Sequence, residues 1–327
     1  MTDIQDLIKD LLSGNRRALA KAITIIESSR KEDFVLADKI LLALKEKKTN
    51  SIRIGISGVP GVGKSTFIEA FGMYLISIGK KVAVLAVDPT SPITGGSILG
   101  DKTRMIELTA SYSAFIRPSP SSGSLGGVAR KTRDTILLCE KAGYDIILVE
   151  TVGVGQSEVA VEKMTDFFLL LLLANAGDEL QGIKKGIMEM ADLILINKAD
   201  GDNKIKAENA RTEFENAIKL FKPKYNHWSA EVQTISSIEK TKLSLVWETI
   251  QEFVKCSGEF ISQNREKQNQ NWLWSSIKDQ FERELVELKN SNLIINNIEN
   301  KYLHDELSLR TACNEILEIY KNSDMKS

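Results

Sequence analysis

An α/β fold with a doubly wound, mostly parallel sheet and helical extensions at both ends is predicted by three features of the 327-residue sequence. Short apolar runs alternate with segments of helical periodicity between Ser51 and about Cys256. A glycine-rich loop separates the first apolar run from the first helical segment, and the most apolar run, 167–173, has the length of a strand buried on both faces. We expect strands at 52–57, 81–87, 113–117, 145–151, 167–174, 193–196 and 232–235, and helices at 65–78, 127–142, 183–191, 206–221 and 243–255.

Residues 1–50 form the expected N-terminal extension. Their apolar residues recur at helical spacing, and the charged run 45–48 is expected to link them to the sheet. A packing appendage and a regulatory element are equally compatible with this pattern.

The glycine-rich loop reads Gly58-Val-Pro-Gly-Val-Gly-Lys-Ser-Thr66, a complete G-x-x-x-x-G-K-[ST] motif between a strand and a helix. Glycines let backbone N–H groups point at phosphate oxygens, and the helix adds the positive end of its dipole. We expect Lys64 to reach the β- and γ-phosphates as a catalytic residue, and the Ser65 hydroxyl to ligate Mg²⁺. The expected nucleotide contacts in this loop are Gly58, Pro60, Gly61, Val62, Gly63, Lys64, Ser65 and Thr66.

The strand at 145–151 carries a carboxylate near its end, Glu150, with Gly153 three residues later. Such a carboxylate can hold Mg²⁺ through its water shell, because Mg²⁺ takes few direct protein ligands. The N–H of Gly153 can contact the γ-phosphate, so the following loop should respond to hydrolysis. Val154 stands where Ras-type proteins carry a water-orienting Gln, and Gln156 is out of register. We therefore expect slow intrinsic hydrolysis that a partner completes or accelerates.

The base preference is predicted by Asn197-Lys198-Ala199-Asp200, which follows the apolar run 193–196 at the carboxyl end of a strand. The Asp200 carboxylate can accept hydrogen bonds from guanine N1–H and the exocyclic amine, whereas adenine presents a lone pair at N1. Lys198 is expected along the base plane, and Asn197 is expected to tie this loop to the phosphate loop. We therefore expect GTP or GDP as the ligand of a P-loop NTPase domain of the G-protein type that spans 51–256.

Composition limits the other functional classes. A net charge of −1 and a pI near 6.3 give no electrostatic reason to expect nucleic acid or an anionic membrane as a partner. Cys139, Cys256 and Cys313 show no C-x-x-C spacing, which is typical of a reducing compartment. The polar, acidic start shows no signal peptide, and the run 167–173 is far shorter than the roughly 20 residues of a membrane helix, so we expect a cytoplasmic protein.

After Cys256 the sequence becomes rich in Gln, Asn, Glu and Lys, with helical spacing over 259–290 and again over 298–320. This segment is too polar to form a core alone, so its apolar stripe must pack on the parent domain or on a second copy of the chain. We expect 257–327 to be the dimerisation arm of a homodimer.

Four longer segments resemble the MeaB/ArgK-type GTPases, the chaperones associated with methylmalonyl-CoA mutase. They read VDPTSP and TGGSILGDKTRM within 87–105, IRPSPSSGSLGGV at 116–128, ETVGVGQSE at 150–158 and AGDELQGIKKGIME at 176–189. The resemblance extends over nearly the whole chain, and segments of this length are far more specific than a phosphate loop alone.

This resemblance implies roles for single residues. Asp88 would lie near the attacking water as a catalytic carboxylate, together with Lys64 and Glu150. The implied Mg²⁺ ligands are Ser65, Asp88, Asp101 and Glu150. A mobile loop that links the nucleotide state to the partner mutase is implied at Asp178, Gln181 and Lys184.

The guanine-capping loop of the family carries a Ser-Ala pair, where this chain has Ser236 and Ser237 after its last strand. Backbone N–H groups contact guanine O6 in such a loop, so we expect the exchange of Ala for Ser to be tolerated and both serines to contact the nucleotide.

The resemblance implies a homodimeric GTPase whose nucleotide state controls cofactor loading and protection of an adenosylcobalamin-dependent acyl-CoA mutase. One alternative is an ArgK-like kinase or ATPase that energises basic amino-acid transport, against which the segment 197–200 argues because it disfavours ATP. The other is a metal-insertion GTPase for nickel enzymes, against which the presence of only two histidines and the lack of paired cysteines argue.

Overall fold

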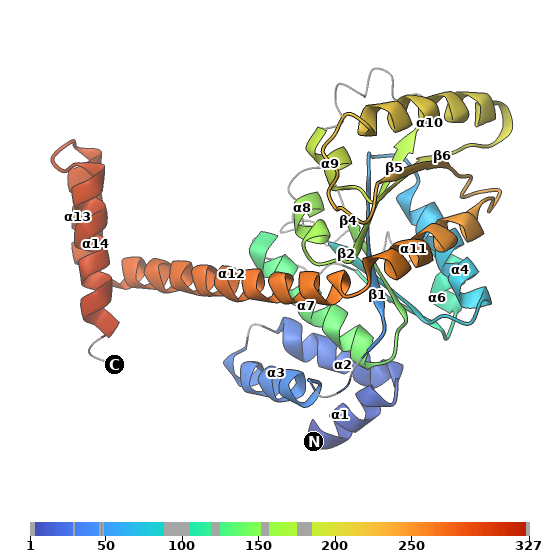
Figure 1. Ribbon diagram of the computed structural model, residues 1–327. Helices are drawn as coiled ribbons and strands as arrows, with labels where there is room; N and C mark the ends of the chain where they lie inside the picture. The colour runs from blue at the N-terminus through green and yellow to red at the C-terminus, as the bar shows by residue number, and fades with distance from the viewer. Residues whose placement is uncertain are drawn as a thin grey trace. The chain divides into compact units, whose positions relative to one another are not determined.

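The computed structural model describes residues 4–28, 30–45, 47, 49–87, 105–118, 125–151, 157–174 and 185–324. Its strands form a seven-stranded sheet of order β3-β2-β4-β1-β5-β6-β7, in which every described pair is parallel (Figure 1). The strands are β1 Ile52–Gly58, β2 Val82–Val87, β3 Ala114–Arg117, β4 Ile146–Thr151, β5 Phe167–Leu173, β6 Leu193–Asn197 and β7 Glu231–Thr234. The predicted doubly wound α/β fold is confirmed.

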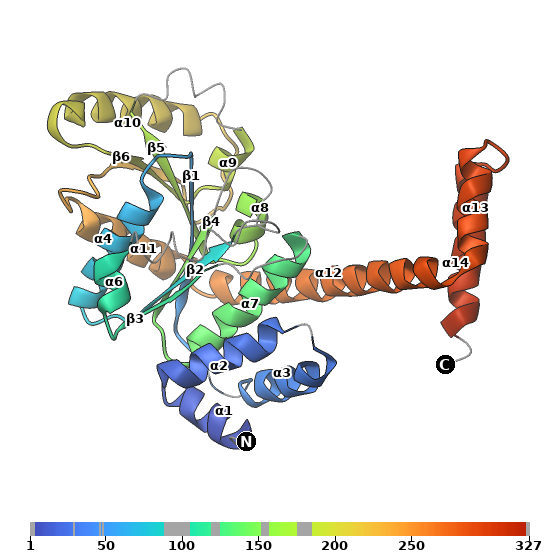
Figure 2. The ribbon, with the colours of Figure 1, turned by 180° about the vertical axis from the view of Figure 1, so that it is seen from behind.

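Helices cover both faces of this sheet. On one face lie α4 Lys64–Ser77, α6 Ile106–Ala110 and α11 Leu243–Ser257, and on the other lie α7 Leu125–Lys141, α8 Ser157–Glu162 and α9 Lys185–Met190 (Figures 1 and 2). A short 3₁₀ turn at Gly201–Asn203 leads into α10 Lys204–Ile218, which packs against β6 and β7. The chain reverses direction across the sheet after β3, and this reversal places β1 and β4 side by side in its middle.

The core follows from the alternation of side chains along the strands. Ile52, Ile54 and Ile56 of β1 point to the same face and share one hydrophobic cluster with Phe67 of α4 and Phe253 of α11. The first six residues of β5 are all buried, so the predicted central strand is confirmed. None of the described helices is both long enough and apolar enough to cross a bilayer.

The N-terminal extension consists of α1 Ile4–Leu12, α2 Arg16–Glu27 and α3 Lys31–Ala43. The helix α2 begins where the Asn15 side chain accepts hydrogen bonds from the N–H groups of Arg17 and Ala18, which caps its first turn. It then packs against α7, so this extension is attached to one face of the sheet domain.

The chain divides into two compact units, Met1–Gln268 and Asn269–Ser327. The second unit contains most of α12 Phe260–Ser291, together with α13 Leu293–Leu303 and α14 Leu309–Asp324, which pack on each other. The domain limits expected at 50 and 257 remain predictions.

The single helical pattern expected over 298–320 is wrong, because two helices with a break between them occupy this segment. Asp305 adopts a left-handed φ of 59°, which an α-helix does not accommodate. The Ser308 hydroxyl accepts a hydrogen bond from the N–H of Thr311 and so caps a new helix start. Spacing of apolar residues alone does not reveal such a break.

An ionic cluster lies inside the first unit, at the edge of the sheet where β1 and β5 begin. Arg53 of β1 donates to both carboxylate oxygens of Glu140 in α7, at 2.8 Å each. Arg265, in the second turn of α12, donates from Nε to Asp166 Oδ1 at 2.7 Å and from Nη2 to the carbonyl oxygen of Ser51 at 2.8 Å. The Glu140 and Asp166 side chains are 2% and 0% exposed, so this cluster anchors the start of α12 on buried charges.

Candidate functional site

The phosphate loop connects β1 to α4 at the carboxyl edge of the sheet. Gly61 and Gly63 have φ values of 77° and 91°, a region that side chains rarely adopt. At Gly58 an added Cβ would lie 2.6 Å from the carbonyl oxygen of Leu171 in β5, so this position also requires glycine. Residues from Lys64 onward form the first turn of α4, whose N–H groups and dipole favour an anion.

Lys64 is the first residue of α4, at the end of this loop. Its Nζ donates to the carbonyl oxygen of Gly58 at 2.8 Å, which holds the side chain folded back over the loop. Burial lowers the pKa of Lys64, and the negative charges of Glu150 and Glu158 oppose that shift. Both carboxylates therefore lie within electrostatic reach of the lysine that is expected to contact phosphate.

The remaining loop residues lie between β1 and the first turn of α4. Val62 is buried, Ser65 and Gly63 are half-buried, and Pro60, Gly61 and Thr66 are exposed. Ser65 and Thr66 follow Lys64 in the first turn of α4.

Glu150 lies near the carboxyl end of β4, which runs between β1 and β2. In the sheet it is level with Ile56 of β1 and Ala86 of β2, and it is 5% exposed. The adjacent Thr151 hydroxyl donates to Ser57 Oγ at 3.1 Å. Glu150 is thus fixed in the strand next to the phosphate loop.

Several expected site residues lie outside the described residues. They are Asp88, Asp101, Gly153, Asp178, Gln181 and Lys184. Among the residues that the structure does describe, no group of three or more His, Cys, Asp or Glu side chains is arranged to hold a metal ion. The Ser65 hydroxyl and the Glu150 carboxylate are hard oxygen donors of the kind that Mg²⁺ takes.

The segment after β6 is bound directly to the phosphate loop. Asn197 Nδ2 donates to the carbonyl oxygen of Val62 at 2.8 Å, and Lys198 Nζ donates to that of Gly61 at 2.8 Å. Lys198 itself adopts a left-handed φ of 60°, and its side chain is exposed along the loop. The segments that carry Asp200 and Lys64, the expected contacts of the base and the phosphate, are therefore joined by direct hydrogen bonds.

Asp200 is in turn held by the segment after β7. The Ser236 hydroxyl donates to Asp200 Oδ2 at 2.6 Å, and Ser236 Oγ accepts from the N–H of Glu239 at 3.1 Å. The Ser237 hydroxyl donates to Asn197 Oδ1 at 2.8 Å. Both serines are buried, so the two segments support each other.

Glu158 is a residue near this site that motif reasoning did not assign. It lies in the first turn of α8, is 2% exposed, and acts on the pKa of Lys64. Its sequence signal is weak, because it stands eight residues after Glu150 with no motif of its own. Its membership of the segment 150–158 was the one available indication.

Replacing Asn197 by alanine should lower the free energy of unfolding by about 1–3 kcal/mol, because the carbonyl of Val62 and the hydroxyl of Ser237 each lose a buried partner. Urea unfolding followed by circular dichroism measures this. Asn203→Ala is the matched control, since Asn203 is exposed and its side chain does not cap α10, and it should change stability by less than about 0.5 kcal/mol. Equal effects of the two changes would contradict the role of Asn197 as a link between loops.

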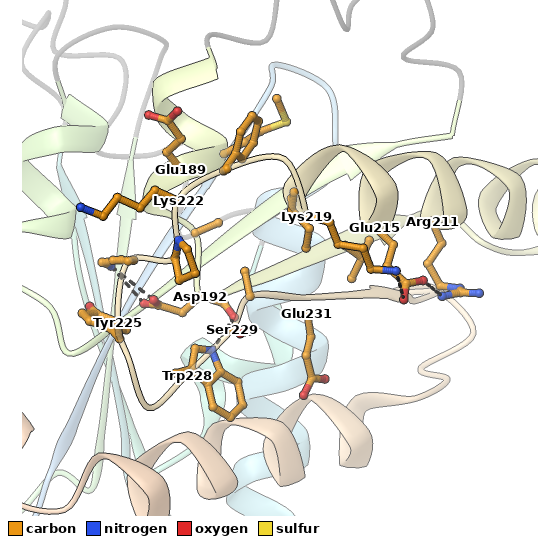
Figure 3. Close-up of a pocket in the computed structure, with 18 residues that line it drawn as sticks. Glu189, Asp192, Arg211, Glu215, Lys219, Lys222, Tyr225, Trp228, Ser229 and Glu231 are labelled. Carbon is orange, nitrogen blue, oxygen red and sulfur yellow. Dashed lines mark hydrogen bonds and ion pairs between the residues drawn. The ribbon is translucent and has the colours of Figure 1, made fainter.

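A cavity lies near the starts of β6 and β7. Residues 197–200, here called the guanine segment, lie at the other end of β6. The cavity has a volume of about 640 Å³, and its walls come from the ends of α9 and α10 and from the loop before β7 (Figure 3). Asp192 and Trp228 line it, and the Trp228 indole N–H donates to the carbonyl oxygen of Asp192 at 3.0 Å. This cavity is separate from the phosphate loop.

Comparison with known proteins identifies the family. The family model described as "Methylmalonyl Co-A mutase-associated GTPase MeaB" matches residues 19–290. The GTPase ArgK of Escherichia coli is 49% identical over 280 residues, which cover 85% of this chain and 84% of that protein. The mitochondrial methylmalonic aciduria type A homolog of Mus musculus is 44% identical over 332 residues, which cover 98% of this chain and 80% of that protein.

A solved structure agrees with these relatives. The crystal structure of a protein named LAO/AO transport system kinase superposes with a TM-score of 0.78 at 37% identity, over 97% of each chain. Together with the complete phosphate loop and the guanine-type segment at 197–200, these likenesses mean that the chain is a GTP hydrolase and belongs to the MeaB family of GTPases.

Proposed function

We propose that this protein is a Mg²⁺-dependent GTPase that acts as a chaperone and gatekeeper for an adenosylcobalamin-dependent acyl-CoA mutase, with methylmalonyl-CoA mutase as the favoured partner. Binding and hydrolysis of GTP would control cofactor loading and protection of that mutase. The family description, which couples a GTPase to this mutase, is the observation that carries the proposal. The chemistry of the site described above supports its nucleotide part.

The proposed hydrolysis is an in-line attack of water on the γ-phosphorus, which breaks the bond to the oxygen that bridges the β- and γ-phosphates. Lys64 and the N–H groups of the phosphate loop would stabilise the negative charge that develops on the phosphate oxygens. Mg²⁺, held by Ser65 and Glu150 with Asp88 and Asp101 as further proposed ligands, would neutralise charge on the β- and γ-oxygens. Gly153 is the proposed contact to the γ-phosphate.

Intrinsic turnover should be slow. Val154 has no side-chain amide that could orient the attacking water. The isolated protein should therefore hydrolyse GTP at a rate below about 1 s⁻¹. Phosphate release measured with and without an added mutase tests this expectation. A faster rate for the isolated protein would contradict the idea that a partner completes the site.

Asp200→Asn should exchange guanine for xanthine as the preferred base. The asparagine amide cannot accept from both guanine donors, and the loss of charge-assisted bonds should weaken GTP binding about 30- to 100-fold. Xanthine presents a carbonyl in place of the exocyclic amine, so its triphosphate should bind the variant more tightly than GTP. Competition of GTP, XTP and ATP for the same site measures this order.

Retained preference of the Asp200→Asn variant for GTP would contradict the assignment of Asp200 to the base. ATP binding to the wild-type protein as tightly as GTP would instead favour the alternative of a kinase or ATPase linked to amino-acid transport, which is the activity that the name of the similar LAO/AO transport system kinase suggests.

The partner is tested by nucleotide-dependent binding. Purified wild-type protein, loaded with GDP or with a non-hydrolysable GTP analogue, should bind a methylmalonyl-CoA mutase with affinities that differ between the two states. Lys184→Ala and Gln181→Ala should reduce that difference, because these residues and Asp178 form the proposed coupling loop. Equal binding in both states, or none, would contradict the gatekeeper role.

We also propose that residues 257–327 form the arm of a homodimer. Within the second unit, Leu273, Trp274 and Ile277 of α12 are 60%, 63% and 45% exposed, which is an unusual density of uncovered apolar side chains on one helix. Light scattering of the full chain should give twice the mass of 36.4 kDa.

A further inference from the structure

The short helix α8 packs on β1 and β4, and its last residue, Glu162, contacts Lys224. Its first turn carries Glu158, whose charge acts on Lys64. Its fifth residue, Val161, is fully buried against β1, where an added Cβ on Gly55 would lie 2.9 Å from Val161 Cγ1. The helix thus lies directly on the strand that leads into the phosphate loop. A displacement of α8 would move Glu158 relative to Lys64.

The last residue of α8 is held by Lys224, which comes from the loop between α10 and β7. Lys224 Nζ lies 3.1 Å from Glu162 Oε1 and donates to the carbonyl oxygen of Met190, the last residue of α9, at 3.0 Å. It also lies 3.3 Å from Asp192 Oδ1, immediately before β6. One ammonium group therefore joins the ends of two helices to the start of β6, and Asp192 lies at this junction in the wall of the cavity described above (Figure 3).

The junction is charged under ordinary conditions. Burial alone would lower the pKa of Lys224, but Asp192, Tyr225 and Glu162 outweigh it and keep the ammonium protonated. Burial raises the pKa of Asp192 to about 6, although Lys224 opposes that rise. Lys224 is therefore a permanent cation at this point.

Asp192 does not depend on Lys224 for its position, because its Oδ2 also accepts from the N–H of Phe168 at 2.7 Å. The Glu162 side chain is 22% exposed, and its ion pair with Lys224 connects α8 to the loop between α10 and β7. The contact of Lys224 with α8 is thus separable from the packing of β6. Glu162→Gln removes this contact while Lys224 still pairs with Asp192, so it should loosen α8 without loosening the start of β6.

We propose that Lys224 is a positioning residue for GTP hydrolysis, which fixes the end of α8 through Glu162 and thereby keeps α8 packed on β1, the strand that leads into the phosphate loop. The proposal rests on the proposed function, in which the γ-phosphate lies at Lys64 and Mg²⁺ is held beside it by Ser65 and Glu150. GDP is held by the phosphate loop and the guanine segment, which do not contact Lys224. Loss of Lys224 should therefore affect the hydrolytic step and spare GDP binding.

The test compares Glu162→Gln, Lys224→Met and Lys224→Arg in the full-length protein. Glu162→Gln and Lys224→Met should each lower kcat at saturating GTP about 10-fold or more, because small misplacements of catalytic groups are costly. The Kd for GDP should stay within about twofold. Lys224→Arg, which keeps the charge and can still reach Glu162, should recover most of kcat. The double variant Glu162→Gln/Lys224→Met should be no slower than the slower single variant, since both remove one interaction.

Lys47→Met is the matched control. Lys47 is also part-buried, and its Nζ donates to the carbonyl oxygens of Leu12 and Lys141, away from α8. Its loss should lower Tm and leave kcat per folded molecule unchanged.

Unchanged kcat in both Glu162→Gln and Lys224→Met, with folded protein, overturns the proposal, as does an equal loss of kcat in Lys47→Met. Failure of the proposed function gives a different result. In that case Lys64→Ala would hydrolyse GTP as fast as the wild-type protein, whatever the rates of the Lys224 and Glu162 variants.

Discussion

Lys64→Ala should lower GTP turnover by at least about 100- to 1000-fold, the effect typical of removing one preorganised donor from a developing oxyanion. The Lys64 ammonium lies over the phosphate loop, hydrogen-bonded to the carbonyl oxygen of Gly58, and is placed to move onto a phosphate oxygen when nucleotide arrives. Burial lowers the pKa of Lys64, and the negative charge of a bound phosphate would raise it again, which favours the ammonium form when nucleotide is bound. Phosphate release under single-turnover conditions measures the loss.

The control for this change is Lys39→Ala, which removes the same charge from an exposed position on α3 and should leave turnover unchanged. GDP should still bind the Lys64→Ala variant, because Asn197 and Asp200 and the backbone of the loop remain. Turnover within tenfold of the wild-type rate would contradict the catalytic assignment of Lys64.

The strands and the phosphate loop could be predicted because their determinants are local. The run 167–173 is apolar throughout, and this pattern demands a strand buried on both faces, as β5 is. Gly61 and Gly63 adopt positive φ angles that favour glycine, and the sequence of the loop shows glycine at both positions. Local sequence therefore indicates both the sheet and the place of the nucleotide on it.

The links between distant segments could not be predicted in this way. Lys224 and Glu162 are separated by 62 residues, and nothing in either neighbourhood identifies the other. Val161 of α8 meets Gly55 of β1 although 106 residues separate them in number, and this packing brings the buried Glu158 to the same side of the sheet domain as β1. Contacts of this kind follow from the strand order of the sheet, in which β4 and β1 are neighbours although α4, β2, α6, β3 and α7 lie between them in sequence.

Arg265→Met should lower the free energy of unfolding by about 3–5 kcal/mol, because it leaves the buried Asp166 carboxylate without a cation. Arg265 makes two hydrogen bonds to Asp166 and lies 3.5 Å from Glu140. Asp166 would keep one donor, the N–H of Arg53, for a side chain that is fully buried. Methionine fills similar volume, so the loss would report on charge rather than on packing. Urea unfolding of the full chain measures it.

The surface pair of Arg211 with Glu208 and Glu215 provides the control, because Arg211→Met removes two ion pairs that are a third to a half exposed and should cost less than about 1 kcal/mol. Acid provides a second check on the cause. Burial raises the pKa of Glu140, but Arg53 and Arg265 outweigh it and bring the pKa below its ordinary value of 4.5. The stability that this charge contributes is present above pH 4.5 and is lost as the pH falls through the lowered pKa. The difference between wild type and Arg265→Met should therefore shrink in acid, whereas a loss caused by packing would stay constant.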